Sequence, residues 1–535
     1  MNLFIQDLVS AQADRRPEAP AIVAGDEVMS FELVETQSTQ LARALRESGC
    51  RRGDRVCVLT PKTPAAIMAI IAIYKADCVY VPLDISSPAP RLAKIFKAAD
   101  PQCTLIASST KAPFGALLRA VGATSPVLVG SLDAGAVEGE EFRSSFSMAD
   151  LARVPVERLS YRNWPDDTAH LMFTSASTGT PKGVMITHAA VRQFVLWANH
   201  YFGVRREDRH SGHSPLALDL SILDVFGTLA AGACLYPVAP DLNVFPNRLA
   251  AFMRSSALTQ WCSVPSVMSY MAQLDVLEFN DFPQLKRVMW CGDVLPTRAL
   301  RYWMLRLPHV KFTNLYGPTE ATIASSCYTL PECPRDESVQ VPIGEARAGT
   351  ELLILDPRLQ LLPPNEHGEL YIRGGGLSPG YWNDESATAR AFIPNPHSDD
   401  PSDRLYRTGD LAHVGRDGLV YFEGRADSQI QSRGHRIDLG EIEAALRAVP
   451  CLIDSAVVAI KSDGFEGTNI CCAYAPQPGV EVTPAVLRRL LSELLPPYML
   501  PSHWKAYQRL PLNAQGRLDR LQVATAFTPR AARAS

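Results

Sequence analysis

The most informative stretch of the chain is TSASTGTPKG, residues 174–183, which directly follows the apolar run AHLMF at residues 169–173. Its hydroxyl side chains, two glycines and Lys182 leave a buried strand at one point, so hydrogen-bond donors and positive charge converge where a nucleotide phosphate would sit. The Walker pattern G-x-x-x-x-G-K-[ST] is absent, which indicates a different nucleotide chemistry. A plain surface loop rich in Ser, Thr and Gly is the alternative. The sequence therefore predicts a phosphate loop.

The composition of the chain is typical of a globular protein with several folding units, because 535 residues exceed one ordinary core and 47% of them are hydrophobic. No apolar run approaches the roughly 20 residues that cross a bilayer, and the start of the chain does not resemble a signal peptide, so we expect a cytoplasmic protein without a membrane partner. The net charge of −4 and the lack of a basic stripe argue against nucleic acid. The 12 cysteines lack C-x-x-C spacing and are expected to be free thiols.

The order of apolar segments predicts the domain organisation. Short strand-like runs such as 55–59 and 79–83 alternate with helical segments over the first four hundred residues, which indicates an α/β fold. Turn residues at 424–427 end a strand at 419–422, and a helix bearing Leu439, Ile442 and Leu446 follows, with strands at 455–460 and 469–475 and a helix from Thr483. We expect an α/β core at 1–426 and a small, mobile α+β domain at 427–535.

Three further segments carry polar residues within apolar surroundings: NLYGPTE at 314–320, YRTGD at 406–410 and GRADSQ at 424–429. Together with the phosphate loop, their order and spacing resemble the adenylate-forming superfamily, most closely the amino-acid adenylation enzymes of nonribosomal peptide synthesis. The resemblance covers residues 4–520 approximately. It implies that a carboxylate attacks the α-phosphorus of ATP, giving an acyl-adenylate and pyrophosphate, and that a phosphopantetheine thiol then takes the acyl group.

The resemblance assigns roles around the nucleotide, with ATP and Mg²⁺ as cofactors. Thr319 and Glu320 face the α-phosphate and Mg²⁺, Tyr316 packs on adenine, and Asp410 holds the ribose hydroxyls, since carboxylates accept hydroxyl hydrogen bonds and coordinate hard cations. Glu320 is the expected metal ligand, and Arg517, Thr319 and Glu320 are the expected catalytic residues. The expected nucleotide-binding residues are Thr174, Ser175, Ser177, Thr178, Gly179, Lys182, Asn314, Tyr316, Gly317, Asp410 and Arg425.

Asp427 matches the hinge residue of the family, about which the small domain rotates between the two half-reactions. A plain Asp turn is the alternative.

On the substrate side, Asp219 within the run LALDLSIL, residues 216–223, matches the aspartate that receives the α-ammonium group of an amino acid. An unpaired buried acid is costly, so Asp219 would disfavour acids without an amine. A helix-cap aspartate is the alternative. The family's side-chain pocket maps to an apolar set: Leu220, Leu223, Cys262, Met289, Cys291, Leu315, Ile323 and Ala324.

This apolar lining favours a small or cyclic apolar amino acid. The segments around it are similar to those of freestanding D-alanine:carrier protein ligases and stand-alone proline-activating enzymes, and a hydrophobic pocket separates such substrates by only about 1–3 kcal/mol per methylene. Proline and alanine both remain candidate substrates. Proline is preferred, because Asp219, Leu220 and Leu223 resemble the corresponding residues of the proline-activating enzymes.

Three positions depart from the family pattern. Ala176 replaces a glycine of the phosphate loop, which is tolerable if its φ is negative, and Gln431 replaces a lysine after the hinge. Arg517 replaces the adenylation lysine, and a planar guanidinium displaces contacts that a compact ammonium makes. We expect adenylation at a reduced rate.

The acceptor is expected to be a separate carrier protein. The run SGHSPL, residues 211–216, resembles a phosphopantetheine attachment motif but lies inside the predicted α/β domain, and only 15 residues follow Arg520. The sequence predicts a freestanding amino-acid:carrier protein ligase of a nonribosomal peptide or related secondary-metabolite pathway. An acyl-CoA ligase, and a catalytically silent relative that binds nucleotide or carrier, are the alternatives.

Overall fold

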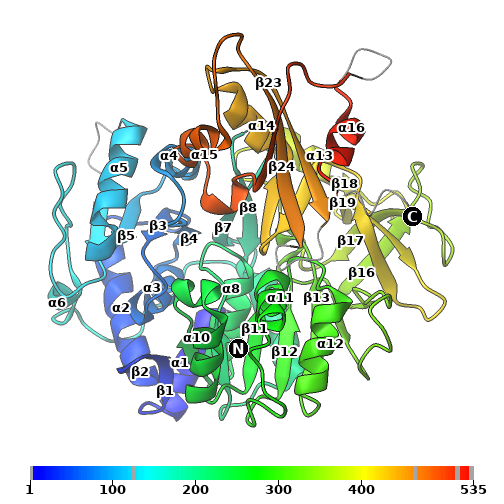
Figure 1. Ribbon diagram of the computed structural model, residues 1–535. Coiled ribbons are helices and arrows are strands. Elements are labelled where there is room, and N and C mark those ends of the chain that lie inside the picture. Colours follow the sequence, from blue (N-terminus) through cyan, green and yellow to red (C-terminus); the bar gives the residue numbers. More distant parts are fainter. Residues whose placement is uncertain (1–3, 123–127, 177–178, 462–466, 513–517, 529–535) are drawn as a thin grey trace.

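A smaller unit formed by the last hundred residues lies over a large α/β unit (Figure 1). The computed structural model describes residues 4–122, 128–176, 179–461, 467–512 and 518–528. The predicted fold class, a large N-terminal domain with a small α+β C-terminal domain, is confirmed. No helix among these described residues is long and apolar enough to span a bilayer.

Two sheets build most of the large unit, and both are mainly parallel. The first has nine strands in the order β15 (Glu345–Ala346), β14 (Ser326–Thr329), β13 (Lys311–Tyr316), β12 (Arg287–Trp290), β11 (Gln260–Ser263), β9 (Arg209–Gly212), β10 (Cys234–Pro237), β1 (Pro20–Ala24) and β2 (Glu27–Ser30). The second has six, in the order β6 (Leu128–Ser131), β5 (Cys103–Ile106), β3 (Arg55–Leu59), β4 (Val79–Pro82), β7 (Thr168–Thr174) and β8 (Lys182–Thr187). Parallel sheets require crossover connections, which helices supply here.

The helices of the large unit connect the strands and cover the sheets. They are α1 (Ile5–Arg15), α2 (Phe31–Glu47), α3 (Pro64–Lys75), α4 (Ala89–Ala99), α5 (Lys111–Val121), α6 (Met148–Leu151), α7 (His188–Phe202), α8 (Leu220–Ile222), α9 (Thr228–Ala230), α10 (Pro246–Ser255), α11 (Pro265–Gln273), α12 (Thr297–Arg306) and α13 (Glu385–Ala391).

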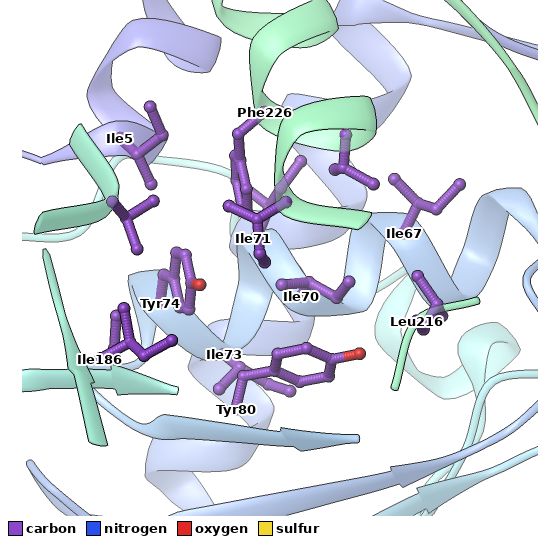
Figure 2. Close-up of a cluster of buried hydrophobic side chains, with 14 of the residues drawn as sticks. Ile5, Ile67, Ile70, Ile71, Ile73, Tyr74, Tyr80, Ile186, Leu216 and Phe226 are labelled. Atoms are coloured by element: carbon purple, nitrogen blue, oxygen red, sulfur yellow. The ribbon is translucent and has the colours of Figure 1, made fainter. Parts of the chain in front are cut away.

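Helix α3 lies at the centre of the main core. Thr63 caps it by accepting a hydrogen bond from the Ala66 N–H, and proline takes the first helical position. Its isoleucines are buried on every face, and Figure 2 shows them packed between α1, β4, β8 and the segment around Phe226. The same cluster contains residues of both sheets. A helix that is apolar all round is stable only when it is enclosed in this way.

An antiparallel sheet completes the large unit and leads to the small one. Its strands are β16 (Thr350–Leu355), β17 (Gly368–Gly374), β19 (Arg404–Val414), β18 (Phe392–Pro394) and β20 (Val420–Arg425). The predicted strand at 419–422 therefore continues to Arg425, because Gly424 and Arg425 pair with β19 instead of forming the expected turn.

The described part of the small unit contains two sheets and three helices. The elements are β21 (Gln429–Ser432), β22 (His435–Asp438), α14 (Leu439–Arg447), β23 (Leu452–Lys461), β24 (Thr468–Pro476), α15 (Pro484–Ser492), β25 (His503–Ala506) and α16 (Arg520–Thr525). Leu439, Ile442 and Leu446 lie in its core, as their helical spacing predicts.

Candidate active site

A cavity of about 730 Å³ lies between the two units. Its lower wall follows the carboxyl ends of β11, β12 and β13, and its upper wall comes from β20 and from β21 to β24 of the small unit. The carboxyl ends of parallel strands are the usual ligand-binding edge of an α/β sheet, because side chains and loops converge there. The fold thus positions one site at the junction of the two units.

The cavity brings together most of the residues that the sequence predicts for a nucleotide and an amino acid. The predicted residues that line it are Thr174, Ser175, Asp219, Leu220, Cys291, Asn314, Leu315, Tyr316, Gly317, Thr319, Ile323, Asp410, Arg425 and Asp427. The predicted residues outside its lining are Gly179, Lys182, Leu223, Cys262, Met289, Glu320 and Ala324. Ser177, Thr178 and Arg517 lie outside the described residues.

The predicted phosphate loop connects the antiparallel strands β7 and β8, so that Thr174 and Lys182 are paired across the ladder. Gly179 has a φ of 74°, a conformation that favours glycine. The φ of Ala176 is not positive, so its side chain is tolerated at this position of the loop. The Ser175 hydroxyl donates to the Arg436 carbonyl at 2.6 Å. It also accepts from the Asp438 N–H at 3.1 Å. The loop therefore contacts the small unit directly.

Asp410 lies in a polar cluster with Tyr316, Arg425 and Asp427. Its carboxylate accepts a hydrogen bond from the Tyr316 hydroxyl through one oxygen and pairs with Arg425 through the other. Burial raises its pKa, against the opposing effects of Arg425 and Tyr316. Each carboxylate oxygen keeps a lone pair that a ribose hydroxyl would use.

Glu320 is 1% exposed and is held by residues that the sequence does not predict. Arg436 of β22 pairs with it at 2.9 Å. The Tyr381 hydroxyl donates to its other oxygen at 2.7 Å. Burial raises the pKa of Glu320, but the Arg436 charge and the Tyr381 hydroxyl outweigh burial, so the pKa lies below its ordinary value. The carboxylate is therefore ionised, and the small unit neutralises it.

The backbone is strained immediately after Glu320. Thr322 and Ile323 have φ values of 61° and 72°, which non-glycine residues rarely adopt and which are costly for a β-branched side chain. The Thr322 hydroxyl holds this turn by donating to the Gly376 carbonyl at 2.7 Å. Such strain persists only where the surroundings enforce it, and it directs Ile323 towards the cavity.

Asp219 borders the cavity beside the apolar residues. Burial raises its pKa to about 6, and the Thr319 hydroxyl and the Leu220 N–H offset burial only in part. Glu320 lies near enough for its charge to raise the pKa further. An ionised Asp219 therefore lacks a cationic partner among the described residues, and an ammonium group entering the cavity would supply one.

Comparisons with known proteins agree with this geometry. The family described as AMP-binding enzyme matches residues 9–382, and the AMP-binding enzyme C-terminal domain matches residues 441–517. The chain belongs to the AMP-binding enzyme family. The predicted resemblance to the adenylate-forming enzymes is thereby confirmed, and so, at the level of the family, are ATP and Mg²⁺ as cofactors.

Several relatives of this AMP-binding enzyme are peptide synthases. Tyrocidine synthase 2 of Brevibacillus parabrevis is 32% identical over 517 residues, which cover 96% of this chain and 13% of that protein. Tyrocidine synthase 1 of the same organism is 33% identical over 522 residues, which cover 96% of this chain and 44% of that protein. The chain thus spans less than half the length of either relative.

A solved structure extends the likeness to the whole chain. The adenylation domain AlmE of Vibrio cholerae, determined in complex with glycyl-adenosine-5'-phosphate, is 25% identical, and the match covers 99% of this chain and 98% of that chain with a TM-score of 0.83. The architecture of this AMP-binding enzyme is therefore that of an adenylation domain.

Four residues of the predicted side-chain pocket lie outside the lining of the cavity, within the core of this AMP-binding enzyme. Leu223, Cys262, Met289 and Ala324 are each at most 1% exposed and belong to the main core. Asp293, which the sequence analysis does not single out, also lines the cavity, and burial raises its pKa to about 7. The cavity thus has apolar residues beside Asp219, and Asp293 is a lining acid outside the predicted set.

The β21–β22 hairpin docks the small unit onto the large one. Gly434, at its tip, has a φ of 79°, and a Cβ there would lie 2.4 Å from a methyl group of Val264. Arg91 of α4 and Glu441 of α14 form a second, buried ion pair between the units. Because the hairpin tip lies so close to Val264, only glycine fits at position 434.

Asp427, the predicted hinge, follows β20 and receives two hydrogen bonds from the Arg425 guanidinium, at 2.7 Å each. Burial raises its pKa, but Arg425 outweighs burial and lowers the pKa below its ordinary value. Arg425 therefore joins Asp410 to Asp427. The sequence carries no local signal for the missed Arg436, whose partner Glu320 lies 116 positions earlier in the chain.

Proposed function

We propose that the protein activates a small apolar amino acid, proline or alanine in preference, as an aminoacyl-AMP and transfers it to the phosphopantetheine thiol of a separate carrier protein. The observation that carries the proposal is Asp219, a half-buried carboxylate that borders the cavity without a cationic partner among the described side chains. An α-ammonium group would pair with it, and Leu220, Cys291 and Ile323 would contact a compact apolar side chain.

In this proposal the cavity residues hold the two reactants. Thr174 and Ser175 would bind phosphate oxygens, Tyr316 would pack on adenine, and Asp410 would accept the ribose hydroxyls. The amino-acid carboxylate would attack the α-phosphorus and expel pyrophosphate, beside Thr319. This placement lowers the barrier by orienting the two groups at a short distance.

Glu320 would hold Mg²⁺, whose charge stabilises the phosphate oxygens during the attack. Its ionised carboxylate is an oxygen ligand of the kind that Mg²⁺ prefers. Arg436 now pairs with this carboxylate, so a cation at Glu320 would have to replace Arg436.

The test is mass spectrometry of acyl-adenylates formed from ATP, Mg²⁺ and a mixture of amino acids and simple carboxylates. We expect prolyl- or alanyl-adenylate. An adenylate formed only from carboxylates without an amine would refute the proposal and support an acyl-CoA ligase. Transfer is then tested with a phosphopantetheinylated carrier protein against free coenzyme A.

A further inference from the structure

We infer that His367, His413 and Glu423 form a binding site for a borderline divalent cation such as Zn²⁺, on the antiparallel sheet and outside the cavity. One ligand atom from each residue lies within 4.8 Å of the others. None of the three lines the cavity, so the inference is independent of the proposed function.

The strand register explains why these residues meet. The pairing of Gly368 with Ala412 places His367, just before β17, beside His413 on β19. Glu423 lies on the next strand, β20, at the irregularity of the β19–β20 ladder. The candidate ligands therefore come from β19, β20 and the residue just before β17. The irregularity of the β19–β20 ladder sets the direction of the Glu423 side chain.

The Nδ1 atom of His413 lies close to the Glu423 carboxylate but forms no well-aligned hydrogen bond with it. Its Nδ1 lies 2.7 Å from Glu423 Oε1. That buried nitrogen nevertheless has no properly oriented hydrogen-bond partner in the described part of the chain. Its ring is stacked on Tyr421 at 5.3 Å, and the His367 ring lies 4.8 Å away. The plane of the His413 ring is thus fixed, with Nδ1 facing the carboxylate.

The separations suit a bound metal ion. Zn²⁺ holds nitrogen and oxygen ligands at about 2.0–2.2 Å, so tetrahedral ligand atoms are about 3.4 Å apart. The observed separations run from 2.7 Å for the His413 and Glu423 atoms to at most 4.8 Å within the cluster. Rotations of the His367 and Glu423 side chains, which are exposed, would bring all three atoms to the ion.

The ligand types select the cation. Two imidazoles and one carboxylate suit Zn²⁺, Ni²⁺ or Cu²⁺, whereas Mg²⁺ prefers oxygen ligands and retains several waters. Asp417 adds negative charge nearby, since Tyr421, whose ring is stacked on His413, donates its hydroxyl to the Asp417 carboxylate at 2.7 Å. Three protein ligands leave one position for water or an external ligand.

A cation at this site would join the strands that carry part of the nucleotide site. Asp410 lies three residues before His413 on β19, and Arg425 lies two residues after Glu423 on β20. The bound ion would hold β17, β19 and β20 together. We therefore expect Zn²⁺ to raise the thermal unfolding temperature.

The test is calorimetric titration of Zn²⁺ into the metal-free full chain in buffer that contains Mg²⁺, with thermal unfolding as a second readout. We expect one equivalent of Zn²⁺ to bind, and both His413→Asn and Glu423→Gln to weaken binding at least 10-fold. The matched control is His200→Asn, which changes an exposed histidine at the end of α7 and should bind as the unchanged protein does.

Two results would overturn the inference: no Zn²⁺ binding by the unchanged protein, or equal binding by both cluster variants. The second result would assign the ion to the cysteines, which are free thiols. If His413→Asn fails to fold because it loses the Tyr421 contact, the Glu423→Gln variant, altered at an exposed residue, decides the question alone.

Discussion

Replacing Asp219 with asparagine should separate substrate recognition from folding stability. Asparagine keeps the shape of the side chain but leaves an incoming α-ammonium group without a counter-charge. Removing one partner of a buried ion pair costs about 3–5 kcal/mol, which corresponds to a loss of about 150- to 5,000-fold in kcat/KM for the amino acid. Because Asp219 borders a water-accessible cavity, we expect the lower end of this range.

The same variant should be more stable than the unchanged protein at neutral pH. The folded pKa of Asp219, about 6, lies above its ordinary value of 3.8, so the folded state binds the proton more tightly than the unfolded state does. The free energy of unfolding therefore falls as pH rises from about 4 to 6, and at pH 7.5 it is lower by at most about 3 kcal/mol. Asp219→Asn removes this loss, so its advantage should appear at pH 7.5 and vanish near pH 4.

The assay is amino-acid-dependent ATP–pyrophosphate exchange between pH 5 and 8, with chemical denaturation at pH 4 and 7.5. In the unchanged protein, KM for the amino acid should rise as pH falls below about 6, because protonated Asp219 no longer pairs with the ammonium. The matched control is Asp293→Asn, another half-buried acid of the same cavity whose pKa is also raised by burial. If Asp219→Asn keeps kcat/KM within threefold, or Asp293→Asn loses as much, the assignment of Asp219 is wrong.

Three further changes test the junction of the units and the far end of the chain. Gly434→Ala would bring a Cβ to 2.4 Å from Val264, so carrier loading should fall about 5- to 100-fold while pyrophosphate exchange persists; equal loss of both would contradict the docking geometry. Arg436→Ala leaves Glu320 without its ion-pair partner and should expose the β21–β22 hairpin to faster amide hydrogen exchange; unchanged exchange would show that the pair does not hold the units together. Arg517→Lys should raise pyrophosphate exchange about 10-fold or more, and no increase would show that the arginine is not limiting.

The sequence predicts local elements well where the residues themselves determine them. Thr483 before a proline predicts the start of α15, and the apolar spacing of Leu439, Ile442 and Leu446 predicts the buried face of α14. The strand ending at Arg425 is longer than predicted, because pairing with β19 overrides the turn preference of Gly424. Tertiary hydrogen bonding, which a local pattern does not contain, decides that boundary.

The sequence predicts those site residues that lie in a recognisable local motif, but not the contacts between distant segments. Asp219, Tyr316 and Asp410 lie in recognisable segments, and the structure places all three at one cavity. Arg436 and Tyr381 meet Glu320 from 116 and 61 positions away along the chain, so sequence spacing gives no sign of either contact. Polar networks of this kind depend on how the units pack, and packing is determined by the whole core.

The contacts that dock the small unit use the same groups that ATP would need. Ser175 of the predicted phosphate loop bonds to the backbone of Arg436 and Asp438, and Glu320, the proposed Mg²⁺ ligand, pairs with the Arg436 side chain. A single hairpin, β21–β22, therefore occupies both the phosphate and the metal positions of the proposed site. If Glu320 holds Mg²⁺ as proposed, the cation competes with Arg436 for that carboxylate, so binding of Mg·ATP would weaken the docked arrangement. With Asp427 as the predicted hinge, the Arg425 contacts to Asp427 would link that movement to Asp410.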